Sequence, residues 1–516
     1  MEGRFILIMI SVFFMACDGL LEVTPENSVT FENVMKSEKD VESSVTAIRS
    51  AFRDNIAFTA NSLPVIKGLI ADEYNDYDYL RIKRLDPSQH ATNHVSVNWG
   101  IYYQVIAYTN VVLDNVKYVD NVPEGRMRFY VGQSCFYRAY AYFCIAQVWG
   151  DAPILANGRD VEVKAKSSWF EVCRFALDDV RRAIDLLPKR DSLYSYAGKK
   201  LDRNDIPCRE SAYALKAHIC AWMGSLREDK DLLDEAIRAA NEVISSPFYE
   251  LAKTPEEVCA SVLMGDSREG IFEIRIDYNE TVNQINPFTT MRDFVCWPVR
   301  RDMGPRDMTT KDQSRIRAKI RYTTVDHMFD KKDLRRDAYF YKLDSMGRVG
   351  TDTTGGFAYP YKFRKEIVYA DGYNMGKFMN IDQDRIMLRL ADIILLRAEC
   401  YARVGDEKNA IIDLNRIRDR AKANAFPSGS EVDRDPRGLR YAVYKEREKE
   451  LLWEDTRYFD MVRNGYCREE MGTEEYKNLT DQDILDGALY LPVSFTAFNE
   501  NPAMVQNRYW KKRLNN

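Results

Sequence analysis

Carboxylates and tyrosines alternate in one short segment of the chain, residues 72–79. The carboxylates are Asp72, Glu73, Asp76 and Asp78, and the rings between them are Tyr74, Tyr77 and Tyr79. Two carboxylates held at a fixed separation in a cleft hydrolyse glycosidic bonds. Aromatic rings beside carboxylates, amides and guanidinium groups instead bind sugars, because the ring covers the apolar face of a pyranose while polar groups bond its hydroxyls. A tyrosine-rich loop favours binding, since hydrolysis needs a more rigid cleft.

The same combination of aromatic and polar side chains continues elsewhere in the chain. Trp297 precedes Pro298 in a predicted loop and is the strongest single candidate for stacking on a sugar. Trp99 begins a predicted helix and is equally well explained as a core residue. For each loop tyrosine, packing on the protein surface is as good an explanation as contact with a ligand. The candidate binding residues are Trp297, Trp99, Asp72, Tyr74, Tyr77, Tyr79, Arg81, Asn98 and Arg300.

No catalytic motif accompanies these residues. The sequence contains no GxSxG, P-loop, HExxH or GxGxxG pattern. His90 and His94 are close in sequence but have no cysteine nearby, so no metal site is predicted. No calcium-loop spacing is recognisable, and a structural calcium ion is an alternative that the sequence leaves open. We therefore expect a binding protein that is not an enzyme and has no cofactor.

The N-terminus is predicted to be a targeting segment. Arg4 precedes an apolar run from Phe5 to Ala16, which is too short to span a bilayer and is typical of a signal peptide. Cys17 follows directly, as in a lipobox, so residues 1–16 are predicted to be removed and Cys17 to be lipidated. The alternative is an ordinary secretory signal with a cysteine there by coincidence.

Composition bounds the remaining classes. A formal net charge of −5 provides no basic surface for nucleic acid. A mean hydropathy of −0.44 and 30% charged residues argue against a polytopic membrane protein. Apart from Cys17 there are nine cysteines, several in apolar helical stretches, and we expect them to be buried free thiols.

Helical periodicity predicts a mostly α protein. Helical segments are expected over approximately 31–56, 98–250 and 384–465, and loop-rich segments over approximately 57–97 and 252–383. The helices come in pairs with a loose period near 34 residues, which indicates degenerate tetratricopeptide-like pairs that form a superhelical scaffold. We expect residues 17–516 to be one domain, with the loop-rich block on the ligand side. The C-terminal segment 489–510 is predicted to be irregular.

Residues 384–465 carry the most distinctive pattern. Met387, Leu390, Ile394, Ala398 and Tyr401 fall on one predicted helical stripe that ends at Gly405. A later helix is rich in charges. Its residues are expected to form ion pairs between helices, with a solvated charged face as the alternative. The charged residues concerned are Glu446, Glu450, Arg389, Arg397, Arg447 and Arg457.

The order of residues from Glu446 to Gly465 resembles the C-terminal signature of the SusD/RagB family. The segment from Phe136 to Leu155, with its Trp-Gly-Asp-x-Pro turn, and the closing LP, NP and QN pairs also resemble that family. Asp455 and Arg508 stand where the family commonly has glycine, so the local turns are expected to differ.

The resemblance implies a SusD-like fold and a role in nutrient uptake. Members are outer-membrane lipoproteins that face outward, bind oligosaccharides and work with a SusC-like TonB-dependent transporter. In the family the ligand site is built from loops after the first helix and from the middle insertion, where the candidate residues lie. Three alternatives remain: a scaffold or lid on the transporter with little glycan affinity, a peptide-capturing protein, and a hydrolase.

Overall fold

The structure is a computed structural model. It describes residues 35–54, 98–159, 162–275, 295–304, 320–346, 356–454, 456–471, 474–494, 496–499 and 501–514. The predicted signal segment, Cys17 and the candidate residues from Asp72 to Arg81 lie outside the described residues.

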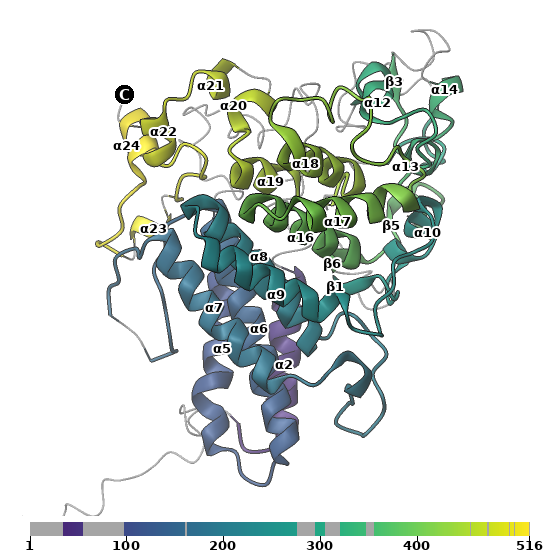
Figure 1. Ribbon diagram of the computed structural model, residues 1–516. Coiled ribbons are helices and arrows are strands. Elements are labelled where there is room, and N and C mark those ends of the chain that lie inside the picture. Colours follow the sequence, from purple (N-terminus) through teal and green to yellow (C-terminus); the bar gives the residue numbers. More distant parts are fainter. Residues whose placement is uncertain are drawn as a thin grey trace, which may run out of the picture.

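Stacked helices form the body of the protein (Figure 1). Neighbours along the chain pack against each other: α5 against α6, α6 against α7, α8 against α9 and α16 against α17. Helix α16 also packs against α9, which joins the C-terminal helices to the earlier ones. The helices are α2 (Glu38–Phe52), α5 (Gly100–Asn115), α6 (Glu124–Val148), α7 (Trp169–Leu186), α8 (Arg209–Arg227), α9 (Lys230–Ile244), α16 (Leu390–Val404), α17 (Glu407–Arg420), α18 (Gly438–Glu450) and α19 (Arg457–Asn464).

This arrangement confirms the prediction of a mostly α fold built from packed helices. Its paired helices are consistent with the expected tetratricopeptide-like character. Local signals explain several of the helix ends. Ser37 and Ser168 begin α2 and α7 with capping boxes, in which the serine side chain accepts from a backbone N–H three residues on. Gly405 ends α16 in the left-handed conformation, with φ of 89°, as the sequence predicted.

Two distant strands pair beneath the C-terminal helices. β1 (Gly270–Ile274) is antiparallel to β6 (Arg385–Arg389), and Glu273 lies opposite Ile386. The prediction that Met387 lies on the α16 stripe was therefore wrong, because α16 begins only at Leu390. Met387 and Leu390 are three residues apart, a spacing that fits a helical face as well as a strand that runs into a helix.

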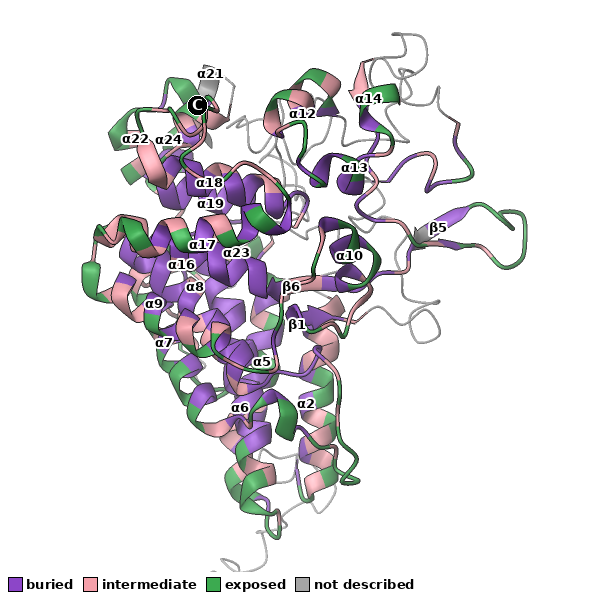
Figure 2. Ribbon diagram, turned by 45° about the vertical axis from the view of Figure 1, so that its right-hand side comes forward, coloured by how far each residue is buried: buried purple, intermediate pink, exposed green. Residues whose placement is uncertain are grey.

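The loop-rich block lies between β1 and β6 in sequence and at one side of the helices in space (Figure 2). It has a small core of its own, which includes Phe329, Tyr339 and Phe340, and Trp453 from the helical part joins it. A short helix, α10 (Pro255–Ala260), precedes β1. The elements of the block itself are β2 (Ile320–Arg321), α12 (Tyr322–Met328), α13 (Arg335–Tyr339), α14 (Leu343–Met346), β3 (Phe357–Ala358), β4 (Glu366–Val368) and β5 (Phe378–Ile381).

The C-terminal part is more regular than expected. Among the described residues, five short helices follow Gly465. Trp510 fixes the last of them in the core, with 0% exposure and an indole N–H that donates to the Tyr490 carbonyl at 2.8 Å. The segment predicted to be irregular, 489–510, holds α23 and the start of α24, which were missed because each helix is under two turns long. The five helices are α20 (Cys467–Glu470), α21 (Glu474–Lys477), α22 (Asp481–Leu485), α23 (Thr496–Asn499) and α24 (Arg508–Leu514).

The nine cysteines of the described residues are buried free thiols, as predicted. Within the part of the chain that the structure describes, no helix is both long and apolar enough to cross a membrane.

Candidate functional site

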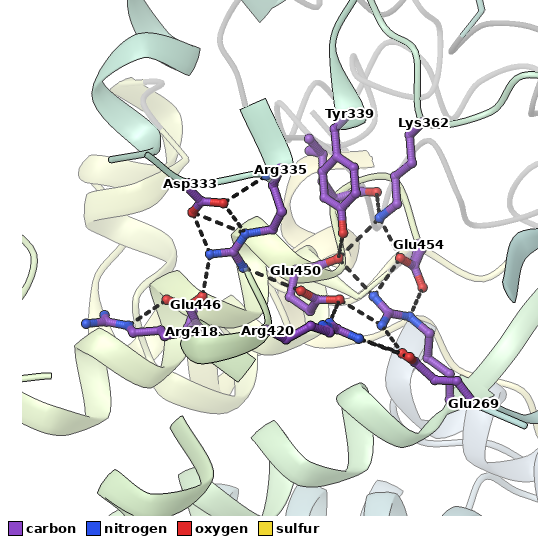
Figure 3. Close-up of polar contacts among 12 residues, drawn as sticks. Glu269, Asp333, Arg335, Tyr339, Lys362, Arg418, Arg420, Glu446, Glu450 and Glu454 are labelled. Atoms are coloured by element: carbon purple, nitrogen blue, oxygen red, sulfur yellow. Dashed lines mark hydrogen bonds and ion pairs between the residues drawn. The ribbon is translucent and has the colours of Figure 1, made fainter. Parts of the chain in front are cut away.

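A buried ion-pair network joins the loop-rich block to the helices (Figure 3). At its centre the Glu450 carboxylate, at the end of α18, accepts from Arg389 Nη1 at 2.8 Å and forms a second ion pair with Arg420. Arg389 also donates to Glu269 Oε1 at 2.7 Å and to Glu454 Oε2 at 2.6 Å. None of these side chains is more than 7% exposed.

Two cations of the loop-rich block complete the network. Arg335 on α13 pairs with Asp333 at 2.7 Å and with Glu446 on α18 at 2.7 Å, and all three side chains are 0% exposed. Lys362 donates to the Leu452 carbonyl at 2.8 Å and to Glu454 Oε1 at 2.5 Å. The network therefore fixes the block against α18 and the turn that follows it.

The charged residues singled out from the sequence do form ion pairs, which confirms the buried alternative. Arg447 bridges Asp392 at 2.7 Å and Asp460 at 2.9 Å, and Arg457 pairs with Glu448 at 2.5 Å. Sequence reasoning missed the partners that come from outside the helical pattern. Arg335, Lys362 and Glu269 stand in segments without a strong period, so nothing marked them as buried. Glu450 is not adjacent to any of them in sequence.

Two carboxylates of α18, Glu446 and Glu448, are held in the charged form. Burial alone would raise the pKa of Glu446, but Arg335 and Arg418 lower that pKa to about 2. Glu448 behaves alike, because Lys445 and Arg457 lower its pKa to about 2 against the effect of burial. A permanently ionised, fully paired carboxylate is poorly suited to act as a general acid near neutral pH. The network is therefore structural.

An aromatic patch lies on the loop-rich block; we define it as Trp297, Tyr341, Tyr359 and Tyr361. The Trp297 ring meets Tyr341 edge-on at a centroid distance of 5.3 Å and Tyr359 at 6.0 Å, and Tyr341 meets Tyr361 at 5.5 Å. Tyr359 is buried and forms the floor, whereas the other three rings are half-buried. Edge-to-face contacts fix the rings while part of their surface stays open to a ligand.

Polar side chains surround the aromatic patch. The Arg364 guanidinium lies 4.2 Å from the Tyr361 ring centroid, donates to the Tyr361 carbonyl at 2.7 Å and pairs with Glu256. The Lys342 ammonium lies 5.3 Å from the Tyr341 centroid and is exposed. Rings with charged donors and acceptors at their rim are the groups that sugar recognition requires.

The described candidate residues take different positions. Trp297 belongs to the aromatic patch. Trp99 is only 6% exposed and packs edge-on against Trp149 at 6.2 Å, so its position supports the core alternative. Asn98 uses its side-chain oxygen to accept from the Gly100 N–H at 2.8 Å.

Arg300 is the candidate whose burial was least expected. It is 3% exposed, pairs with Asp302 at 2.9 Å and lies over the Phe378 ring at 4.6 Å. A direct sugar contact by Arg300 stays a prediction that this position does not support. Tyr341, Tyr359 and Tyr361 were missed in the sequence because they lack periodicity and stand far from Trp297 along the chain.

The described residues hold no cluster of histidine, cysteine and carboxylate side chains that fits a metal ion. Cys296 borders Trp297, and burial raises the pKa of its thiol, so this cysteine remains neutral.

Comparison with known proteins identifies the class of protein that has this helical stack and loop-rich block. A family model described as "SusD family" matches residues 277–510, and one described as "Starch-binding associating with outer membrane" matches residues 21–219. The two matches together cover most of the chain and support a SusD/RagB family protein.

Relatives and solved structures match this chain over most of its length. SusD-like proteins P38 and P25 of Formosa agariphila are each 23% identical to it, with 97% and 95% of both chains covered. A SusD homologue from Bacteroides thetaiotaomicron superposes with a TM-score of 0.74 at 21% identity, over 92% of this chain and 98% of the other. Surface glycan-binding protein A of the same organism, solved with laminarihexaose, gives 0.67 at 18% identity, over 92% and 100%. At these identities the structural likeness concerns the fold.

Proposed function

We propose that this protein is a cell-surface glycan-binding lipoprotein that captures oligosaccharides and delivers them to a partner TonB-dependent outer-membrane transporter. The observation that carries the proposal is the aromatic patch around Trp297, which combines three half-buried rings with charged neighbours. Reversible binding is the whole of the mechanism, with no chemical step.

Physical chemistry accounts for how the aromatic patch would hold a sugar. A pyranose laid on the Trp297 indole would remove apolar C–H surface from water, and Lys342 beside Tyr341 would bond a hydroxyl group at the rim. The rings are already fixed by their mutual contacts, so little rotamer entropy is lost on binding. A shallow site of this kind supports micromolar to millimolar affinity, about −4 to −8 kcal/mol.

The likeness to SusD-family proteins also supports glycan binding. One matching family model is described as starch-binding and associated with the outer membrane, and one similar structure holds laminarihexaose. The cargo of those proteins does not identify the glycan of this one, which we propose only as an oligosaccharide.

The membrane part of the proposal rests on Cys17. Lipidation there would anchor the chain to the outer membrane, facing outward, beside a SusC-like transporter. Replacing the thiol by Cys17→Ser is expected to abolish labelling by a radioactive fatty acid and to release the protein from membranes. Labelling that persists in the variant would contradict the anchor. A tagged wild-type protein should co-purify with a barrel transporter in mild detergent, and its recovery alone would contradict the partnership.

The glycan itself is sought by screening. The chain without residues 1–17 is run through gels that contain each of a broad panel of polysaccharides, and retention marks binding. Retention by one class of glycan would support the proposal and name the cargo. No retention by folded protein, together with binding of peptides, would contradict it and favour the peptide-capturing alternative.

A further inference from the structure

A second pocket, away from the aromatic patch, lies where α2, α6 and β1 meet and has a volume of about 190 Å³. Helix α2 and strand β1 are close neighbours in both views (Figures 1 and 2). Four arginines, Arg49, Arg53, Arg203 and Arg275, line the pocket, and we call it the arginine pocket. Such a gathering of guanidinium groups is unusual, because like charges repel unless an anion or a carboxylate compensates them.

Helix α2 supplies one wall through its spacing. Thr46, Arg49, Ser50 and Arg53 line the pocket at intervals of three, one and three residues, which places them on one face of the helix. The neighbouring face, with Val41, Val45, Ile48 and Phe52, is buried in the core, and Phe52 also lines the pocket. The polar face of α2 therefore turns two guanidinium groups and two hydroxyl groups toward the pocket.

Buried aromatic rings form the floor. The ring centroid of Phe52 lies 5.1 Å from that of Tyr137 and 6.0 Å from that of Phe272, and the Tyr137 and Phe272 centroids are 6.1 Å apart. All three rings are at most 1% exposed. An apolar floor lowers the local dielectric constant, so the charged groups above it act more strongly on a bound ion than they would in water.

The charges of the arginine pocket do not balance. Arg203 is paired with Asp205 at 2.6 Å and Arg53 with Asp54 at 2.9 Å. The side chains of Arg49 and Arg275 make no hydrogen bond or ion pair with the residues that the structure describes. Two guanidinium groups at this cavity thus have no counter-charge among the residues that the structure describes.

Glu273 lines the same pocket as a buried carboxyl group. It is 1% exposed, its Oε1 accepts from the Asp266 backbone N–H at 2.6 Å, and its Oε2 is buried without a hydrogen-bond partner. Burial raises the pKa of Glu273 well above its ordinary value, and the nearby Asp384 charge raises it further. Burial thus disfavours the charged form of Glu273 and weakens it as a counter-charge to the arginines.

We propose that the arginine pocket binds an anionic substituent, a carboxylate or a sulfate ester, of the captured oligosaccharide, so that the cargo is an acidic glycan. The inference rests on the proposed function and names its class of cargo. Guanidinium groups suit both substituents, since their planar N–H pairs bond two oxygens of a carboxylate or sulfate at once. The hydroxyls of Thr46 and Ser50 add neutral donors.

The test compares charged and neutral forms of one glycan. Oligogalacturonides are titrated beside their methyl esters, and sulfated galactan oligosaccharides beside their desulfated forms, into the chain without residues 1–17. We expect the wild type to prefer a charged member by about tenfold or more, with affinity that falls as salt rises. The double variant Arg49→Gln/Arg275→Gln should lose that preference and bind the neutral form unchanged. Arg238→Gln, an exposed arginine on α9, is the control.

Each outcome decides the inference. Equal affinity for charged and neutral forms, or a preference that survives in the double variant, would overturn it and leave the proposed function standing. If no glycan binds, the proposed function fails. The arginine pocket is then tested by measuring the melting temperature with and without inorganic sulfate. A rise in melting temperature with sulfate that the double variant lacks would keep the pocket as an anion site. No rise would overturn that too.

Discussion

The helical stack and the loop-rich block use their polar and aromatic side chains in opposite ways. On α18 and its neighbours, guanidinium and carboxylate groups pair with each other at 2.6–2.9 Å and are hidden from solvent, as in the Arg389–Glu450 and Arg447–Asp460 pairs. In the loop-rich block, Trp297, Tyr341 and Tyr361 keep part of their surface open.

This difference indicates which side chains are available to bind a ligand. Groups whose hydrogen bonds are satisfied inside the protein have little left to offer a ligand, so charge alone does not mark a site. Half-buried rings and uncompensated cations do have surface or charge to offer. The network connects the two regions, because Arg335 and Lys362 come from the block that carries the aromatic patch. A rigid support holds recognition groups in place.

The largest expected effect comes from breaking the network at its centre. Glu450→Ala would leave Arg389, Arg420 and Arg335 without their shared carboxylate. An uncompensated buried charge costs about 3–5 kcal/mol, so the free energy of unfolding in denaturant should fall by about that amount. Glu407→Gln, an exposed glutamate on α17, should change it by less than about 0.5 kcal/mol. Equal stability of the two variants would contradict a structural role for the network.

Acid should weaken the ion pairs that Glu446 and Glu448 form. Glu446 and Glu448 have folded-state pKa values of about 2, below the ordinary value of about 4.3. Groups with lowered pKa stabilise the fold fully above the unfolded value, and that contribution is lost as pH falls from about 5 toward 2. The melting temperature should therefore be level between pH 7 and pH 5 and fall below pH 5. A melting temperature that is unchanged at pH 3 would contradict these pairs.

A smaller effect is expected at the edge of the aromatic patch. Arg364→Gln removes the donors to the Tyr361 and Ala338 carbonyls and the cation over the Tyr361 ring. The loss should cost about 1–2 kcal/mol of stability and weaken glycan binding several-fold, because Tyr361 loses its support. Thermal unfolding and calorimetry measure the two effects. Binding that is unchanged in a destabilised variant would show that Tyr361 lies outside the site.

The helices could be predicted because their signals are local. The buried face of α2 at Val41, Val45 and Ile48 and the glycine stop at Gly405 are visible within a few residues of sequence. The main error, Met387 on a strand, arose where a short strand continues directly into a helix.

The site was harder to predict because its contacts are not local. Trp297 was recognised from its loop position, but its partners Tyr341 and Tyr359 are 44 and 62 residues away. Nothing in the spacing marks those tyrosines. Arg300 shows the opposite case, since a loop arginine that suggested sugar contact is buried against Phe378. The candidates from Asp72 to Arg81 remain predictions.

The account's central claim is that the aromatic patch binds glycan while the network only supports it. The most direct test is calorimetric titration of the glycan retained in the screen into wild type, Trp297→Ala and Trp169→Ala, where Trp169 is a half-buried tryptophan on α7. We expect Trp297→Ala to weaken binding by about tenfold or more with a nearly unchanged melting temperature, and Trp169→Ala to bind like wild type. Equal affinity of Trp297→Ala and wild type would contradict the claim.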